Sequence, residues 1–336
     1  MLKTIPIQAL PSWQESLSDL ITDPQELLAL LALDEKQTGL SLKALQDFPL
    51  RVPRPYLSRI SPGNPADPLL LQVLPSQQEE HFFPGFSNDP LGESAVNPTP
   101  GLLHKYSGRS LLLTTSSCAI HCRYCFRRHF PYEDNRPGKN KWQESLDYIA
   151  QDSSVNEVIL SGGDPLTLSD KHLAWFINEL NTISHIKRLR IHTRLPIMIP
   201  HRVNDSLCQL LSKQRFQVVV VIHSNHAQEF DSHVDSACRR LKENGASLLN
   251  QSVLLKGVND SCTALTELSE RLFDAGVLPY YLHILDKVTG AGHFDVSIDR
   301  ARQLIQEIQA QLPGYLVPRL VCENAGQTSK TLIAIE

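Results

Sequence analysis

The sequence contains no long hydrophobic run. Although 41% of its 336 residues are hydrophobic, no stretch approaches the ~20 consecutive apolar residues that a spanning helix needs. Residues 1–11 also lack the continuous apolar core of a secretory signal. We therefore expect a soluble, cytoplasmic protein without a membrane partner.

The chain also lacks an excess of positive charge and any internal repeat. It carries 32 Lys and Arg against 36 Asp and Glu, for a formal net charge of −4. Because nucleic-acid-binding proteins usually show a basic footprint, we expect no nucleic-acid partner. The length is sufficient for one large core with a smaller appendage.

Cysteine is scarce and unevenly spread. Three of the seven cysteines form the run Cys118-x3-Cys122-x2-Cys125, directly after the apolar residues 111–115. No second Cys-x2-Cys occurs, whereas structural zinc sites usually pair two such knuckles. Three thiolates on a [4Fe–4S] cube would leave one iron open for a ligand. The spacing favours such a cluster, and a zinc site that also uses His121 is the alternative. The scattered cysteines are expected to be small buried hydrophobes: Cys208, Cys238, Cys262 and Cys322.

Composition divides the chain into four regions. Residues 1–75 carry helical patterns, with a capping-box sequence at Ser12 and with Pro24 suited to a first helical turn. Residues 76–104 are rich in proline, which predicts irregular structure. We expect the helical region to be a cap beside the rest. The regions are 1–75, helical; 76–104, connecting; 105–314, barrel; and 315–336, a strand with a lysine-bearing loop.

Strands and helices alternate from residue 110 onward. Apolar runs predict six strands, at 110–115, 157–161, 188–193, 217–223, 247–255 and 278–285. Helical patterns follow them, at 142–151, 169–182, 202–213, 231–243, 262–274 and 297–311. Successive β/α units favour parallel strands with right-handed crossovers. A full eight-fold barrel takes ~250 residues and this region has about 200. The predicted fold is therefore α/β, an incomplete (β/α)6 barrel.

Polar residues follow each predicted strand, where chemistry gathers in barrels of this kind. Ser161-Gly-Gly-Asp-Pro165 comes after the second strand; its paired glycines would let a ligand approach and offer free N–H groups, or would form a plain turn. Three later strands end in His192 and Arg194, in His223 and His226, and in His283 and Asp286, while Asn250 and Gln251 lie within the fifth. Each alone would be read as a surface or satisfied core residue, but together they indicate a site on one rim.

These motifs resemble the radical S-adenosylmethionine enzymes, and within them the lysine 2,3-aminomutases. The matching segments are His104-Lys-Tyr106, Arg109, Cys125-Phe-Arg-Arg128, Ser161-Gly-Gly-Asp164, Asn250-Gln-Ser-Val253, Tyr280-Tyr, His293-Phe and Ser329-Lys-Thr331. The likeness extends over residues 50–332. The compact length and the entry Arg51-Val-Pro-Arg are similar to the subgroup that makes β-lysine for modifying translation elongation factor P.

The resemblance implies a [4Fe–4S] cluster and S-adenosylmethionine. The cluster would be held by three thiolates: Cys118, Cys122 and Cys125. The backbone of Gly162 and Gly163 would support S-adenosylmethionine, with three further candidate contacts: Arg194, His223 and Gln251.

The resemblance also implies pyridoxal 5′-phosphate. Lys330 would carry it, although a lysine in such a loop would by itself be read as a solvated surface residue. Lys105 and Arg109 would contact the phosphate, with Tyr106 nearby.

The implied substrate is L-lysine, converted to β-lysine by movement of the amino group from C2 to C3. Arg127 would bind the substrate carboxylate, and Asp286 and Glu323 would hold the side-chain ammonium. Position 323 is Glu where the fermentative enzymes carry Asp, and Tyr124 stands where they have His. A separate electron-donor protein is also implied, and the oligomeric state is left open.

Three alternatives remain at this point. The chain could be an aminomutase for another amino acid, such as glutamate, or for a protein lysine. The two acids at Asp286 and Glu323 argue against an acidic side chain, and Arg127 as carboxylate partner favours the free amino acid. It could also be a radical enzyme without pyridoxal phosphate, or a binding module stapled by zinc.

Overall fold

The computed structural model describes residues 12–93, 98–131 and 138–335. Its main sheet contains β3 (Leu102–Tyr106), β4 (Arg109–Thr115), β5 (Glu157–Gly162), β6 (Arg188–Thr193), β7 (Gln217–Ile222), β8 (Ser247–Val253), β9 (Leu278–His283), β10 (Arg319–Cys322) and β11 (Thr331–Leu332). The accompanying helices are α7 (Lys139–Gln151), α8 (Asp170–Thr182), α9 (Leu195–Met198), α10 (Asp205–Ser212), α11 (Ser232–Glu243), α12 (Cys262–Asp274) and α13 (Ile298–Gln309).

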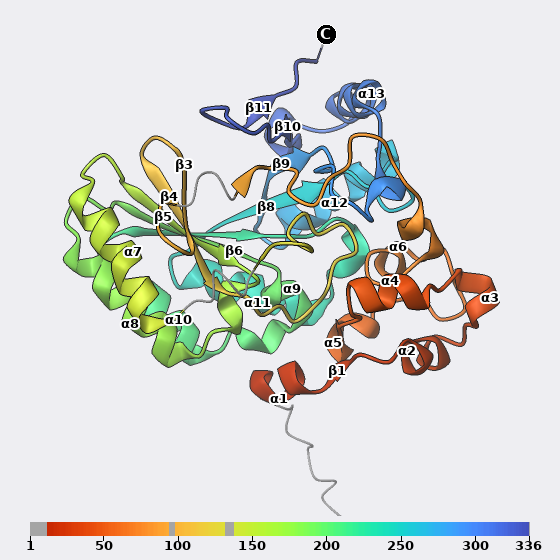
Figure 1. Ribbon diagram of the computed structural model, residues 1–336, viewed down its shortest axis with the longest axis horizontal. Helices are drawn as coiled ribbons and strands as arrows, with labels where there is room; N and C mark the ends of the chain where they lie inside the picture. The colour runs from red at the N-terminus through yellow and green to blue at the C-terminus, as the bar shows by residue number, and fades with distance from the viewer. Residues whose placement is uncertain (1–11, 94–97, 132–137, 336) are drawn as a thin grey trace, which may run out of the picture.

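The strands follow one another in order across a single curved sheet (Figure 1). Neighbours from β4 to β10 are parallel, while the outermost pairs, β3–β4 and β10–β11, are antiparallel. In the described part of the chain β3 and β11 end the order without pairing with each other. The prediction of an incomplete barrel is therefore confirmed.

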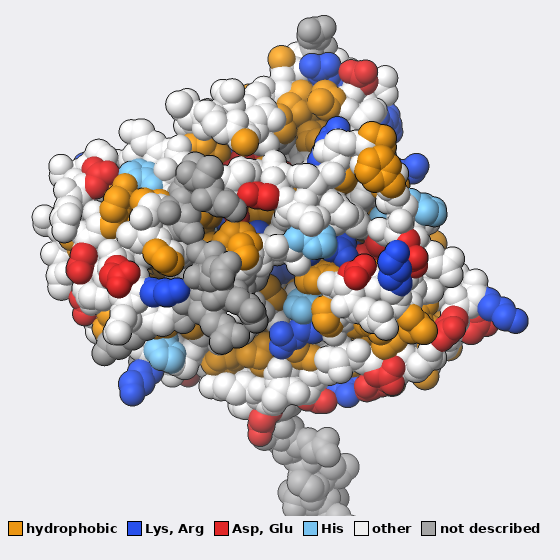
Figure 2. All heavy atoms as spheres, viewed as in Figure 1, with side chains coloured by type: hydrophobic (Ala, Val, Ile, Leu, Met, Phe, Trp, Pro, Cys, Tyr) orange, Lys and Arg blue, Asp and Glu red, His pale blue; other side chains and the backbone are white. Residues whose placement is uncertain are grey.

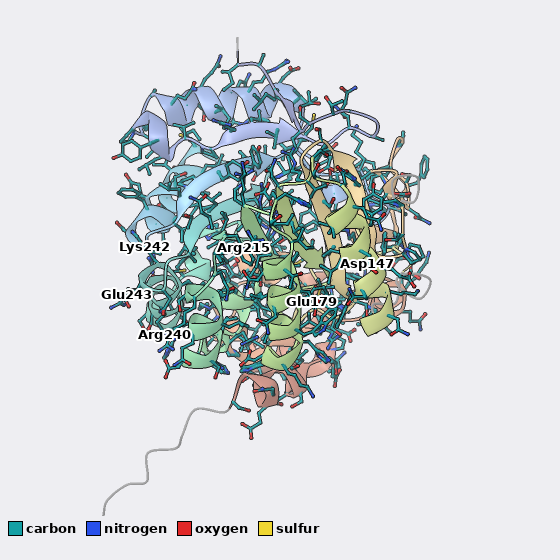
Figure 3. The ribbon with its side chains drawn as sticks, turned by 90° about the vertical axis from the view of Figure 1, so that its left-hand side faces the viewer. Asp147, Glu179, Arg215, Arg240, Lys242 and Glu243 are labelled. Atoms are coloured by element: carbon teal, nitrogen blue, oxygen red, sulfur yellow. The ribbon has the colours of Figure 1, made fainter. Side chains whose placement is uncertain are left out.

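The sequence explains why the helices cover the outside of the sheet. Strand β5 is buried along its whole length, as expected for a parallel strand covered on both faces. Helix α8 buries Leu173, Phe176, Ile177 and Leu180, a spacing that places all four on one face. The opposite faces carry charges, including Asp147, Glu179, Arg240, Lys242 and Glu243 (Figure 3). Burial of the apolar stripe fixes each helix against the sheet.

The N-terminal region packs beside the barrel, away from α7 in the view of Figure 1. Its elements are α1 (Trp13–Ser18), β1 (Leu20–Ile21), α2 (Pro24–Leu30), α3 (Glu35–Thr38), α4 (Leu42–Asp47), β2 (Val52–Pro53), α5 (Arg54–Leu57) and α6 (Pro68–Leu71). Ser12 forms the predicted capping box with Glu15, and Pro24 is the first residue of α2. The Arg202 guanidinium lies 4.3 Å from the centre of a Trp13 ring, which ties α1 to the barrel.

The predicted strands and helices of the barrel are confirmed with small shifts at their ends. The strand expected from residue 315 was too long, because Gly314–Leu316 forms a 3-10 turn and β10 begins only at Arg319. Pro318 has no N–H to donate to a ladder, which explains the late start. The β3–β4 hairpin was not predicted. None of the helices in the described residues combines the length and apolar character that a bilayer crossing requires.

Candidate active site

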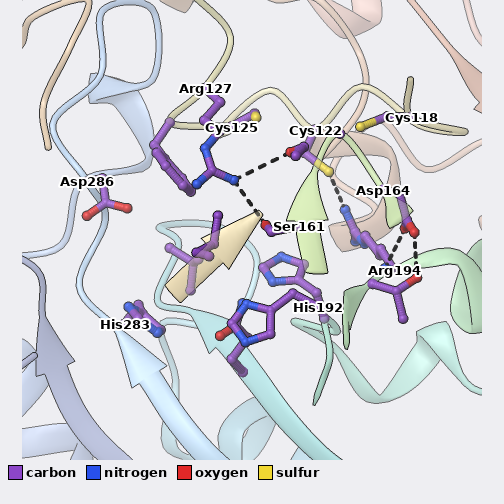
Figure 4. Close-up of a pocket in the computed structure, with 18 of the residues that line it drawn as sticks. Cys118, Cys122, Cys125, Arg127, Ser161, Asp164, His192, Arg194, His283 and Asp286 are labelled. Carbon is purple, nitrogen blue, oxygen red and sulfur yellow. Dashed lines mark hydrogen bonds between the residues drawn. The ribbon is translucent and has the colours of Figure 1, made fainter. Parts of the chain in front are cut away.

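A single cavity of roughly 340 Å3 opens at the carboxyl ends of the parallel strands, where ligands bind in barrels of this kind. Its wall contains the three cysteines, both glycines and all the cofactor and substrate candidates. His226 and Asn250, which the sequence placed on the same rim, do not line it; Asn250 instead binds the backbone of Ser224. Figure 4 shows the cysteine loop on one side and Asp286 and His283 on the other. Figure 2 shows the surface of the molecule hollowed near the middle of one face, with hydrophobic, basic and histidine side chains around the hollow.

The cysteine loop follows β4 and is held by residues that precede the barrel. The N–H of His121 donates to the carbonyl of Arg51 (3.1 Å), and the N–H of Arg123 donates to the carbonyl of Gln72 (2.9 Å). The fully buried Arg123 side chain donates to both oxygens of Glu79 at 2.8 and 2.6 Å. Bidentate pairs of this kind fix geometry as well as charge. The N-terminal region is therefore part of the wall that shapes this loop.

The geometry gives no support to a zinc site that uses His121. This ring stacks on Phe48 with centroids 4.6 Å apart, and its Nδ1 lies 2.7 Å from the carbonyl oxygen of Pro49. Within the described residues, no three His, Cys, Asp or Glu side chains converge closely enough to hold one metal ion. Burial raises the pKa of Cys118 and raises that of Cys125 to about 11, so their thiolates require a nearby cation such as bound iron.

The two glycines allow the loop after β5 to touch the cysteine loop. A Cβ on Gly162, where φ is +119°, would lie 2.4 Å from the carbonyl oxygen of Thr115, and one on Gly163 would lie 2.2 Å from that of Ser117. The N–H of Gly163 donates to Thr115 (2.6 Å). The expectation of a free N–H at Gly163 is therefore wrong, because the neighbouring loop already accepts it.

Arg194 follows β6 and points at the cysteine loop (Figure 4). Its Nη1 lies 2.8 Å from the Sγ of Cys122, while Nη2 lies 2.7 Å from Oε1 of Gln72 and 3.0 Å from Oε2 of Glu229. Its backbone N–H donates to Asp164 at 2.7 Å. Burial alone would lower the pKa of Arg194, but Cys122 and Glu229 raise it well above its ordinary value. The guanidinium is thus a permanent cation beside Cys122.

Tyr124 and His223 meet on the floor of the same end of the cavity. The Tyr124 hydroxyl lies 2.8 Å from Nε2 of His223, and Asn225 donates to this hydroxyl at 2.7 Å. Burial, together with the charge of Arg194, lowers the pKa of His223 to about 3, so the ring is neutral. Gln251, on β8, lines the cavity close to these groups.

The opposite end of the cavity holds a chain of alternating charges. Nζ of Lys330 lies 2.7 Å from Oε2 of Glu323, and Nζ of Lys105 lies 3.2 Å from Oε1 of the same carboxylate. Lys105 also lies 3.7 Å from Glu93, which binds Arg127 through two contacts of 2.8 Å. Burial alone would raise the pKa of Glu323, but Lys330 and Lys105 hold it at about 2. All five groups line the cavity.

The β3–β4 hairpin supplies further positive charge to this end. Tyr106 and Arg109 are paired across the hairpin, and the Arg109 guanidinium lies 4.6 Å from the centre of the Tyr106 ring. Burial raises the pKa of Tyr106, so its hydroxyl keeps its proton. Because Lys105 lies on the same strand as Tyr106, this one hairpin brings two cations to the cavity.

Buried groups with spare hydrogen-bonding capacity lie between the two ends. The Nε2 atoms of His192 and His283 are buried and have no hydrogen-bond partner within the described residues. Burial lowers the pKa of both rings, so they are neutral. Burial and then the charge of Glu323 raise the pKa of Asp286 to about 7. These groups favour a ligand that supplies polar contacts and a positive charge.

Comparison with known proteins connects this cavity with a family. Residues 112–267 match the Radical SAM superfamily. The chain is 51% identical to the L-lysine 2,3-aminomutase of Escherichia coli (strain K12), over 96% of this chain and 95% of that protein. It is 50% identical to the L-lysine 2,3-aminomutase of Haemophilus influenzae, over 96% of both chains. The corresponding protein of Clostridium subterminale is 33% identical, over 95% of this chain and 77% of that protein. The chain belongs to the lysine 2,3-aminomutase family.

Membership of the lysine 2,3-aminomutase family implies a [4Fe–4S] cluster, S-adenosylmethionine and pyridoxal phosphate, and the cavity suits all three. The three cysteines at one end can hold a cube and leave one iron open. At the other end Lys105, Arg109 and Lys330 supply positive charge for a phosphate. The unpartnered nitrogens of His192 and His283 can accept or donate to a bound ligand.

Three residues of this aminomutase-family site were not found from the sequence. Gln72, Glu93 and Glu229 lie outside the matched motifs, yet each binds a residue that the motifs identified. The only signal was that Glu93 is an acid in the proline-rich region. Gln72 and Glu229 had none, because a buried polar residue is recognised by its partners rather than by its spacing.

Proposed function

We propose that this protein converts L-lysine into β-lysine by moving the amino group from C2 to C3. The observation that carries the proposal is one cavity lined both by the three-cysteine loop and by Lys330. When bound, the cluster with S-adenosylmethionine supplies a radical that removes an unactivated hydrogen, and pyridoxal phosphate carries the migrating amino group. The protein positions these groups and excludes water from them.

At the first end, Cys118, Cys122 and Cys125 hold the cluster. The pair Gly162 and Gly163 keeps the loop after β5 close against the cysteine loop, and their backbone would line the site for S-adenosylmethionine. His223 and Gln251 line its site, and they offer neutral polar groups to an adenosine moiety. Arg194 serves the same site less directly, since its guanidinium is engaged by Cys122, Gln72 and Glu229.

At the second end, Lys330 carries pyridoxal phosphate. Lys105 and Arg109 bind its phosphate, and Tyr106 holds Arg109 through the contact of its ring with the guanidinium. Glu323 lies between Lys105 and Lys330 and orients both ammonium groups toward the cavity wall that would hold the cofactor.

Lysine then binds between the ends. Arg127 binds its carboxylate, a task suited to a planar guanidinium, and Asp286 and Glu323 hold its side-chain ammonium. Burial of both acids makes their attraction for a cation stronger than it would be at the surface. This pair disfavours a substrate with an acidic side chain, which sets the proposal apart from an aminomutase for glutamate.

The test is an anaerobic assay with reconstituted cluster, S-adenosylmethionine, pyridoxal phosphate, a strong reductant and L-lysine. β-Lysine that forms only when both organic cofactors are present supports the proposal. Accumulation of 5′-deoxyadenosine without β-lysine would keep the radical chemistry and contradict the substrate. Absence of both products from protein with full iron and sulfide would contradict the whole assignment.

We further propose that the β-lysine is used to modify translation elongation factor P and that a separate protein donates the electron for the cluster. The likeness of the chain to the short subgroup supports the first point. The scatter of the other cysteines along the sequence supports the second, because they do not form the motif of another cluster. To test the first point, the gene is deleted. We expect elongation factor P to lose its modification, and added β-lysine to restore it.

A further inference from the structure

Gln72 lies where the N-terminal region meets the cysteine loop. It caps the carboxyl end of α6 and is fully buried. A buried amide requires partners for its oxygen and its nitrogen. An N-terminal region that only covered the barrel would not need such a residue. Its partners therefore indicate what this part of the N-terminal region does.

The partners of Gln72 belong to the cluster end of the cavity. Its backbone carbonyl accepts from the N–H of Arg123, which lies between two of the cluster cysteines (2.9 Å). Its side-chain oxygen accepts from Arg194 at 2.7 Å and from Asn225 at 3.0 Å. Its side-chain nitrogen donates to the Pro68 carbonyl of its own helix at 3.0 Å and to Glu229 at 3.3 Å. Because the oxygen of Gln72 faces donors and its nitrogen faces acceptors, the amide has only one satisfactory orientation.

The same network fixes the Arg194 guanidinium against a cysteine sulfur. Nη2 is shared between Gln72 and Glu229, which leaves Nη1 at 2.8 Å from the Sγ of Cys122. Glu229 is itself fully buried and accepts from the backbone N–H groups of Asn225 and His226 at 2.8 and 3.2 Å. Both holders of the guanidinium are thus rigid.

Hydrogen bonds and charges beside the sulfur ligands tune an iron–sulfur cluster. A cation that donates to a ligand sulfur stabilises the reduced cluster, which carries one more negative charge. We propose that Gln72 is a positioning residue: it holds Arg194 against Cys122 and so raises the reduction potential of the cluster. This inference rests on the proposed role of the three cysteines, and it assigns to the N-terminal region a part in electron transfer.

The first test compares Gln72→Leu with Gln78→Leu, which makes the same chemical change at an exposed glutamine of the following segment. Iron and sulfide content, thermal unfolding and the midpoint potential are measured on each reconstituted protein. We expect Gln72→Leu to retain iron and to show a more negative potential, with turnover lower by about tenfold to a hundredfold. Gln78→Leu should match the wild type. An unchanged potential in iron-replete Gln72→Leu would overturn the inference.

Because Gln72→Leu leaves buried donors unsatisfied and costs stability, a second variant tests the same arrangement from the other side. Glu229→Gln keeps the shape and removes the negative charge beside Arg194, so the potential should shift in the positive direction. A negative shift, or none, would overturn the proposed influence of Arg194. Wild-type protein that binds no iron would instead contradict the role of the cysteines, which separates the two failures.

The pathway can also be tested directly. In an Arg194→Met background the further change Gln72→Leu should not move the potential, because the cation that Gln72 positions is absent. A full shift in that background would show that Gln72 acts on the cluster by another route and would overturn its role as the holder of Arg194.

Discussion

The two ends of the cavity are built from different interactions. At the cluster end one cation, Arg194, is held by a buried amide and a buried acid, and its neighbours Tyr124 and His223 are uncharged. At the lysine end five charged groups alternate in sign from Lys330 to Arg127. Glu229 does not line the cavity, whereas all five charged groups of the second end do, so an incoming phosphate, carboxylate or ammonium could replace them one for one.

This difference indicates which parts must stay fixed and which must exchange partners. At the cluster end the Arg194–Glu229 pair is also held by Gln72 and by a backbone N–H, so each member has one satisfactory arrangement. Buried ion pairs are costly to form and costly to break on one side, but a ligand of matching charge can substitute for one partner. We therefore infer that the cluster end is preformed and that the lysine end reorganises when cofactor and substrate bind.

The largest expected effect comes from Lys330→Ala. Removal of the amine that we propose to carry pyridoxal phosphate should lower β-lysine formation by about a thousandfold or more, while iron and sulfide stay at wild-type levels. The absorbance of the bound cofactor should be lost with the activity. Undiminished turnover would end the assignment of Lys330, and loss of iron would show that the two ends are not independent.

The reverse experiment is Cys122→Ala. This variant should bind less iron and make no β-lysine, yet it should still bind pyridoxal phosphate, because the charges at the other end are untouched. Cys262→Ala is the matched control, since Cys262 begins α12 and does not line the cavity. Iron content equal to that of the control would remove Cys122 as a ligand.

The sequence predicted the barrel well and the support of the site poorly. The strand and helix periods from residue 110 onward are local signals, so β4 to β9 and their helices were found within a few residues. The β3–β4 hairpin was missed because it lies at the edge of a proline-rich region. Glu93 and Gln72 were missed for another reason: their contacts join residues 34 and 122 positions apart, and no spacing in one sequence encodes such pairs.

A smaller effect is expected for Glu93→Gln. Glu93 holds the Arg127 guanidinium through two contacts of 2.8 Å, and an amide can accept only one of them. Looser orientation of Arg127 should raise the KM for lysine by about tenfold to a hundredfold, with a smaller change in kcat. Glu144→Gln, at an exposed position on α7, is the control. A lower KM in Glu93→Gln would show instead that Glu93 competes with the substrate carboxylate.

The smallest effect is a dependence on pH at the lysine end. The pKa of Asp286 is raised to about 7 by burial and by Glu323, so in the free enzyme this acid ionises as the pH rises from 6 to 8. Only the ionised form attracts the substrate ammonium. The value of kcat/KM, which reports the free enzyme, should therefore increase with pH by about tenfold over this range. Glu323 should not contribute to this rise in kcat/KM, because its pKa of about 2 keeps the carboxylate ionised throughout the range. The midpoint potential of the cluster should stay constant over the same range.

Asp286→Asn should flatten the rise in kcat/KM, and a rise that persists in this variant would assign the titration to another group.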